Sequence, residues 1–205
     1  MPSGWTTAAS ADDGAGSVSV TDGALVLNDT DNKMYFAFGE LEKTYTSDNL
    51  AGKQLVMELD VKPGNGQQWI RAMLTNGTNA DKPNMAIEPY INAKTKNGGD
   101  YTYRSGDGTV ATNNEFSPVL GSGTVKTDEW NHIKIALSVD DGAFSVTVTN
   151  ADGTTATGVT TKADAIREND TDRTKITHVH FGTGGVATGV VSYDNVKVYV
   201  CSDIS

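Results

Sequence analysis

Segments 67–74 and 85–92 alternate apolar with polar residues, as strands with one buried and one solvated face do. Ile70 and Leu74 share a face in the first segment, and Ile87 and Ile91 share one in the second. The residues that point the other way are Gln67, Trp69 and Arg71 in the first segment, and Glu88, Tyr90 and Asn92 in the second. Because consecutive strands usually pair antiparallel, we expect these six side chains to form one patch.

The chemistry of this patch suits a hydroxylated ring. Tyrosine and tryptophan offer flat apolar area with a polar handle, Arg71 offers a rigid fork of donors, and Glu88 accepts hydrogen bonds. The patch therefore predicts a saccharide-binding surface. Two structural alternatives stay open: a loop could cover Trp69, and Arg71 could form an ordinary cross-strand ion pair with Glu88.

Three further residues could extend this surface. Tyr101 and Tyr103 share a strand face just after a glycine-rich turn, where they could wall a groove or simply pack at a sheet edge. His180 alternates with Val179 and Phe181, so it could enter the binding face. The alternative for His180 is a hydrogen-bonded surface histidine.

Composition limits the classes of protein to consider. The chain has 205 residues, enough for one sizeable domain over residues 1–205, and no apolar run approaches a membrane span. The net charge of −10 argues against nucleic acid and makes a strongly anionic polymer a less natural ligand. Cys201 is the single cysteine, so an internal disulfide is impossible. No signal peptide is visible, and we nevertheless expect a secreted domain that is monomeric.

The spacing of alternating segments predicts an all-β fold. Glycine-rich turns such as Thr21–Gly23 and Asp140–Gly142 separate the segments, and the one helix candidate is Lys162–Glu168. The expected strands are Val18–Val20, Ala24–Leu27, Met34–Phe38, Leu55–Val61, Gln68–Leu74, Met85–Ile91, Tyr101–Arg104, Ile133–Val139, Phe144–Thr149 and two strands within 176–200. Alternation favours two stacked antiparallel sheets. The expected core residues are Leu25, Leu27, Leu55, Met57, Leu59, Ile70, Leu74, Ile87, Ile133, Ile135, Leu137, Val146, Val148, Val179, Phe181, Val196 and Val198.

Several motifs together resemble the concanavalin-A-like jelly roll shared by lectins, laminin-G-like modules and carbohydrate-binding modules. They are Gly4-Trp5 ahead of 20–27, the segment 129–137 with Trp130, Phe144–Val148, and the closing Tyr193-Asp-Asn-Val-Lys-Val. The resemblance implies a β-sandwich whose concave sheet face binds glycans. It also implies that Trp5 and Trp130 pack at the ends of the core. A structural calcium at Asp194, with Asp12 or Asp13 as partners, is implied too, and an acidic residue that caps a turn is the alternative.

Enzymes of the same fold are the main rival class. Glycosidases of the fold use the motif Glu-x-Asp-x-x-Glu, but here Glu58 and Asp60 lack the second glutamate, because Lys62 and Pro63 follow. A polysaccharide lyase would need Tyr103 or His180 as its base and Arg71 to neutralise a uronate.

We therefore expect a non-catalytic carbohydrate-binding module for a plant cell-wall polysaccharide of the β-glucan, xyloglucan or hemicellulose type. Such a module holds an attached catalytic module near its polymer and needs no cofactor for function. The alternatives are a jelly-roll polysaccharide lyase or glycoside hydrolase, and a structural or adhesion module that binds a protein.

Overall fold

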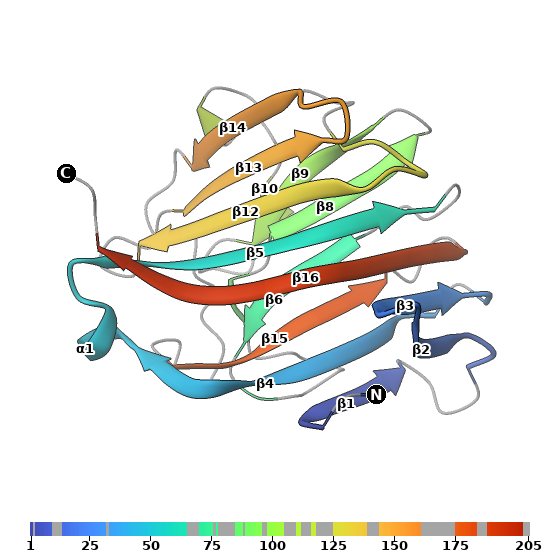
Figure 1. The fold of residues 1–205 in the computed structure, drawn as a ribbon, viewed down its shortest axis with the longest axis horizontal. Helices are drawn as coiled ribbons and strands as arrows, with labels where there is room; N and C mark the ends of the chain where they lie inside the picture. The colour runs from blue at the N-terminus through green and yellow to red at the C-terminus, as the bar shows by residue number, and fades with distance from the viewer. Residues whose placement is uncertain are drawn as a thin grey trace.

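The computed structural model describes residues 1, 3–9, 14–31, 33–64, 70–75, 77, 85–87, 89–95, 98–104, 110–111, 116–117, 125–138, 144–160, 175–183 and 188–202. These residues form two stacked antiparallel sheets, each with eight strands in the described part of the chain (Figure 1). The predicted all-β jelly-roll sandwich is therefore confirmed. No helix in the described residues is both long and apolar enough to cross a membrane.

Sheet A has the strand order β1-β4-β15-β6-β8-β9-β10, with β7 paired to β6. Its strands are β1 (Trp5–Ala9), β4 (Tyr35–Thr46), β15 (Lys175–Thr183), β6 (Ile70–Thr75), β7 (Met85–Ile87), β8 (Pro89–Thr95), β9 (Gly98–Arg104) and β10 (Val110–Ala111). Every pairing in sheet A is antiparallel.

Sheet B has the strand order β11-β14-β13-β12-β5-β16-β3-β2 (Figure 1). Its strands are β11 (Phe116–Ser117), β14 (Thr155–Thr160), β13 (Phe144–Asn150), β12 (Asn131–Ser138), β5 (Lys53–Pro63), β16 (Gly189–Ser202), β3 (Ala24–Asp29) and β2 (Ser17–Thr21). The predicted turn between β2 and β3 is present, with Asp22 and Gly23 at positive φ as a two-residue hairpin turn requires.

One short helix, α1 (Ser47–Leu50), joins β4 to β5. The Thr46 side chain accepts from the Asn49 backbone N–H, and the Asn49 side chain accepts from the Thr46 N–H. This reciprocal capping begins a helix that the sequence patterns did not predict. The helix candidate Lys162–Glu168 and the predicted turn Asp140–Gly142 lie outside the described residues.

The core lies between the sheets, where alternate positions of each strand meet. On β5, Leu55, Met57, Leu59 and Val61 are all fully buried, as their alternation predicts. Val196 and Val198 only pack against the core from its border and are half-buried. The side chains of Ile70 and Ile87 lie outside the described set.

The sequence pattern suggested that β16 alternates without a break, but the structure shows one. Its register against β5 shifts between Asp194 and Lys197, and Asn195 has a φ of 52°. A β-bulge of this kind inserts an extra residue and bends the strand. Beyond the bulge, Val196, Val198 and Val200 return to the core side.

Candidate functional site

The predicted patch depends on strands β6 and β8 being neighbours, and they are. Arg71 stands directly opposite Tyr90, and Ile70 stands opposite Ile91, in an antiparallel pairing. Ala72 and Leu74 are buried in the core, so Arg71 points to the outer face of sheet A. The structure thus brings two of the predicted ligand-binding positions into register on adjacent strands.

The other predicted positions are distributed differently. Gln67, Trp69 and Glu88 lie outside the described residues. Asn92 stands opposite Asp100, two positions along β8 from Tyr90. Tyr101 stands opposite Ile91 and Tyr103 opposite Pro89, so their backbone positions alternate with that of Thr102, the partner of Tyr90. The side chains of Tyr90, Asn92, Tyr101 and Tyr103 lie outside the described set.

His180 lies on the outer side of sheet A but does not reach solvent. Its ring is fully buried, 4.2 Å from the Phe38 ring and 5.0 Å from the Phe36 ring between centroids. Neither ring nitrogen has a hydrogen-bond partner among the described residues. Burial, with a smaller contribution from the Arg71 charge, holds the pKa of His180 well below its usual value, so the ring is neutral.

The prediction that His180 is a binding residue or an exposed histidine therefore needs correction. The physical reason is its neighbours: Phe36 and Phe38 of β4 stand beside β15 and present two more rings on the same face. Arg71 borders this buried aromatic cluster, with its guanidinium carbon 5.9 Å from the Phe36 ring centre. Arg71 itself stays partly exposed at the border of the cluster.

Tyr193 is a positioning residue that the sequence patterns missed. It projects from β16 through the core, and its hydroxyl lies 3.0 Å from the carbonyl oxygens of both Arg71 and Gly182. Those two residues face each other across β6 and β15, so one hydroxyl ties sheet B to the backbone that carries Arg71. The sequence signal that could have predicted the inward direction of Tyr193 is its two-residue spacing from Val191, since both side chains are buried.

The predicted calcium at Asp194 remains a prediction. The Asp194 carboxylate accepts from the Asn195 backbone N–H at 2.7 Å, and Asp60 stands across from it on β5. Both oxygens of Asp60 are already bonded, to His132 and Asn195. No group of three potential metal ligands occurs among the described residues, and Asp12 and Asp13 are outside them.

Glu58 and Asp60 lie on the outer face of sheet B, as their alternation with buried β5 residues predicts. The Tyr199 hydroxyl donates to Glu58 at 2.6 Å, and Lys134 lies 3.6 Å away. The Tyr199 hydrogen bond, followed by the Lys134 and His132 charges, lowers the pKa of Glu58. The acid of a glycosidase needs a raised pKa, so the lowered pKa of Glu58 does not suit that role, whereas an ionised carboxylate is what the nucleophile role requires.

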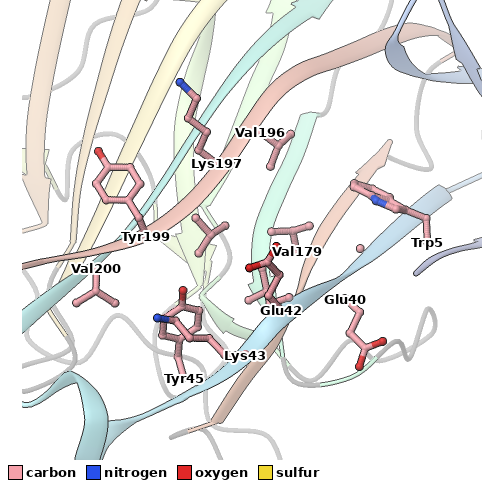
Figure 2. A pocket seen from close by; sticks show the side chains of 13 residues that line it. Trp5, Glu40, Glu42, Lys43, Tyr45, Val179, Val196, Lys197, Tyr199 and Val200 are labelled. Carbon is pink, nitrogen blue, oxygen red and sulfur yellow. The ribbon is translucent and has the colours of Figure 1, made fainter. Parts of the chain in front are cut away.

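A groove of about 690 Å³ lies between β4 of sheet A and β16 of sheet B (Figure 2). Strand β4 forms one side and β16 the other, and Trp5 and Tyr45 lie at opposite ends. Beyond Glu40 on β4 and beyond Asp194 on β16, no described strand pairs with the edges that face this groove. We call this feature the edge groove. Its walls combine valines of β16 with charged side chains of β4 such as Glu42 and Lys43.

Comparison with known proteins finds likeness in structure alone. No protein-family model matches the chain, and no curated protein matches it either. The alignment with the Lotus tetragonolobus seed lectin covers 100% of this chain and 96% of the lectin chain, with a TM-score of 0.58 and 10% sequence identity. The lectin UEA-II in complex with galactose covers 96% of this chain and 92% of the lectin chain, with a TM-score of 0.57 and 12% identity.

A third structure extends the comparison beyond seed lectins. The carbohydrate recognition domain of Emp46p, in its potassium-bound form, matches 96% of this chain and 88% of its own. Its TM-score is 0.54 and its identity 12%. At such identities the likeness establishes the fold, which is the concanavalin-A-like jelly roll, and leaves the ligand to be argued from the residues.

Proposed function

We propose that this chain is a single, monomeric, secreted carbohydrate-binding domain without catalytic activity. Its ligand is a plant cell-wall polysaccharide of the β-glucan, xyloglucan or hemicellulose type. It binds on the outer face of sheet A and keeps an attached catalytic module close to the polymer. The lectins that share the fold support the class of ligand, and the plant polymer is our narrower proposal.

The observation that supports this proposal most is the register that sets Arg71 opposite Tyr90. Directly opposed side chains on one sheet face have Cβ atoms about 5 Å apart, close enough to contact the same sugar ring. The arginine offers several fixed donors to hydroxyl and ring oxygens. Tyrosine supplies a flat ring for the CH face of the sugar at low entropic cost.

Arg71 is also held for this role by its surroundings. Its side chain leaves a backbone that Tyr193 ties to sheet B, and its guanidinium lies beside the buried Phe36 ring. Restricting a donor before the ligand arrives reduces the entropy lost on binding. We therefore assign Arg71 as the principal polar contact.

Titration calorimetry of R71A and Y90A with cellohexaose and xyloglucan heptasaccharide tests the proposal. Each variant should weaken binding at least 10-fold with an unchanged thermal midpoint. Lys175→Ala is the matched control, since this exposed lysine lies at the opposite end of β15 from Gly182, the residue that faces Arg71. Wild-type affinity in both R71A and Y90A would remove this face from the site.

The enzymatic alternative has a separate test. A lyase acting through Arg71 would release unsaturated uronates from polygalacturonate, and a glycosidase would release reducing ends. We expect neither product after prolonged incubation with a panel of polysaccharides. Sustained product formation that R71A abolishes would replace the binding proposal with a catalytic one.

A second candidate function is favoured by the edge groove. Unpaired strand edges can take an extended peptide as an additional strand, and half-buried valines line one side of this groove. A protein-binding module of this kind would bind peptides through β4 and β16 and would be insensitive to R71A. Panning a random peptide library against the wild-type chain and against V198K separates the two functions.

A further inference from the structure

A second groove, of about 620 Å³, lies on the outer face of sheet B. Its lining includes Trp130 and Lys62 at one side, Asp60, Asp194 and Asn195 along β5 and β16, and Asp22 in the turn between β2 and β3. We call it the Trp130 groove. It is distinct from the face that carries Arg71, because all of its strands belong to sheet B.

Trp130 is 38% exposed, although the sequence resemblance implied that it packs at the end of the core. The buried Asn131 side chain organises the loop before it. The Asn131 amide accepts from the Lys126 N–H at 2.8 Å and donates to the carbonyl oxygens of Lys126 and Glu129 at 2.8 and 2.9 Å. The Asp128 N–H also donates to the Pro63 carbonyl, at 2.7 Å. These hydrogen bonds fix the backbone from which the Trp130 indole projects before any ligand arrives.

The part of the groove along β5 and β16 is fixed as well. Asn195, at positive φ in the β16 bulge, donates from its side chain to Asp60 at 2.7 Å. His132 bonds the other Asp60 oxygen at 2.8 Å. Positive φ is uncommon for residues other than glycine, and a bulge re-aims the side chains that it carries. The Asp60 carboxylate and the Asn195 amide are thereby oriented beside the groove.

The charges in the groove select among ligands. Three carboxylates, of Asp22, Asp60 and Asp194, and one ammonium group, that of Lys62, line the groove. The Lys62 ammonium lies 5.8 Å from the Trp130 ring centre. Carboxylates accept hydrogen bonds from sugar hydroxyls, the ammonium donates to sugar oxygens, and the indole packs against CH groups. A uronate or sulfated sugar would meet excess negative charge, so the groove suits an uncharged one.

We propose that the Trp130 groove is a second saccharide-binding site, which takes a neutral hexose or pentose unit. The class of ligand rests on the proposed function, whereas the location rests on the groove alone. Two sites on opposite faces of the sandwich would let one domain contact two polymer chains, which raises the overall avidity.

Indole signals in a proton–nitrogen correlation spectrum provide the test, because the chain has three tryptophans. W5F, W69F and W130F assign the three signals. Titration with cellohexaose, xylohexaose or mannohexaose should shift the Trp130 signal saturably with at least one sugar.

D60N should then weaken that binding at least 5-fold, and R71A should leave it unchanged. In W130A, the Asn195 amide signal serves as the second readout and should lose its response.

Val159→Ala is the matched control, since this exposed residue lies on β14 of the same sheet and does not line the groove. A Trp130 signal that responds to none of the three sugars overturns the inference. If R71A-sensitive binding persists in that case, the proposed function stands without the second site, and if all binding is absent, both fall. Tighter binding of trigalacturonate than of any neutral sugar at Trp130 overturns the class of ligand.

Discussion

At the scale of single residues, Glu58 shows how the outer face of sheet B is organised by polar contacts. Its carboxylate accepts from the Tyr199 hydroxyl, and that hydrogen bond is the largest cause of its lowered pKa. A carboxylate whose pKa is lower in the folded state stabilises the fold above its ordinary value of 4.5. This stabilisation is lost as the pH falls from 4.5 through the folded value.

We therefore predict that Y199F destabilises the fold by about 1 kcal/mol at pH 7, the scale of one partly exposed hydrogen bond to a charge. The deficit should shrink as the pH falls below 4.5, because protonation removes the charged acceptor in both proteins. Urea denaturation at pH 7, 4.5 and 3 measures it. A deficit that is constant over this range would mean that Tyr199 acts through packing alone.

Sequence alternation predicted the direction of the Arg71 side chain but not the burial of His180, and the difference has a physical reason. The direction of Arg71 follows from its own strand, since Ala72 and Leu74 are apolar and fix the parity of β6. The burial of His180 depends on Phe36 and Phe38, which are far away in sequence and adjacent only after β4 and β15 pair. The pattern of one strand carries no information about such neighbours.

At the scale of elements, Tyr193 connects the two sheets by a polar contact inside an apolar core. Its hydroxyl is buried with the carbonyl oxygens of Arg71 and Gly182 as partners, and burial raises its pKa. Y193F should cost about 1–3 kcal/mol, because the two carbonyl oxygens lose the single hydroxyl hydrogen that they share. Urea denaturation measures this loss.

Tyr45→Phe is the matched control for Y193F, since Tyr45 is also buried but its hydroxyl has no hydrogen-bond partner among the described residues. We expect Y45F to change stability by less than about 0.5 kcal/mol, as no buried hydrogen bond is lost. Equal losses in Y193F and Y45F would show that the inter-sheet hydrogen bonds add no stability.

Strands β1 and β4 approach each other closely at Gly39. A Cβ at Gly39 would lie 2.7 Å from the Trp5 ring, and that ring stacks on Phe181 with centroids 5.9 Å apart. G39A should therefore destabilise the fold by about 1–3 kcal/mol, through overpacking. In the W5A background the same substitution should cost much less, and a double-mutant cycle measures the coupling. Additive effects would show that Trp5 is not the obstacle.

Element boundaries could be predicted where apolar and polar residues alternate without a break. They could not be predicted where the backbone departs from regular strand geometry. Strands β5, β12 and β13 follow the predicted segments closely because each presents one apolar face. The bulge at Asn195 and the helix at Ser47 were not predicted, because each depends on local backbone hydrogen bonds that hydrophobic periodicity does not encode.

At the scale of the whole molecule, the net charge of −10 sets a preference that no single contact determines. A negative surface repels anionic polymers over about 10 Å at 0.1 M salt, and added salt screens that repulsion. Binding of a neutral polymer involves no such repulsion. We therefore predict that salt strengthens binding of an anionic polymer and leaves binding of a neutral polymer nearly unchanged.

Affinity electrophoresis in gels containing either xyloglucan or polygalacturonate, at 20 and 200 mM salt, tests this prediction. Retardation by xyloglucan should change less than 2-fold, and any retardation by polygalacturonate should increase with salt. EDTA is included because divalent cations bridge carboxylates of the polymer to those of the protein. Polygalacturonate binding that is strong at low salt and weakens as salt is added would instead indicate a local basic surface around Arg71, and with it the uronate-binding alternative.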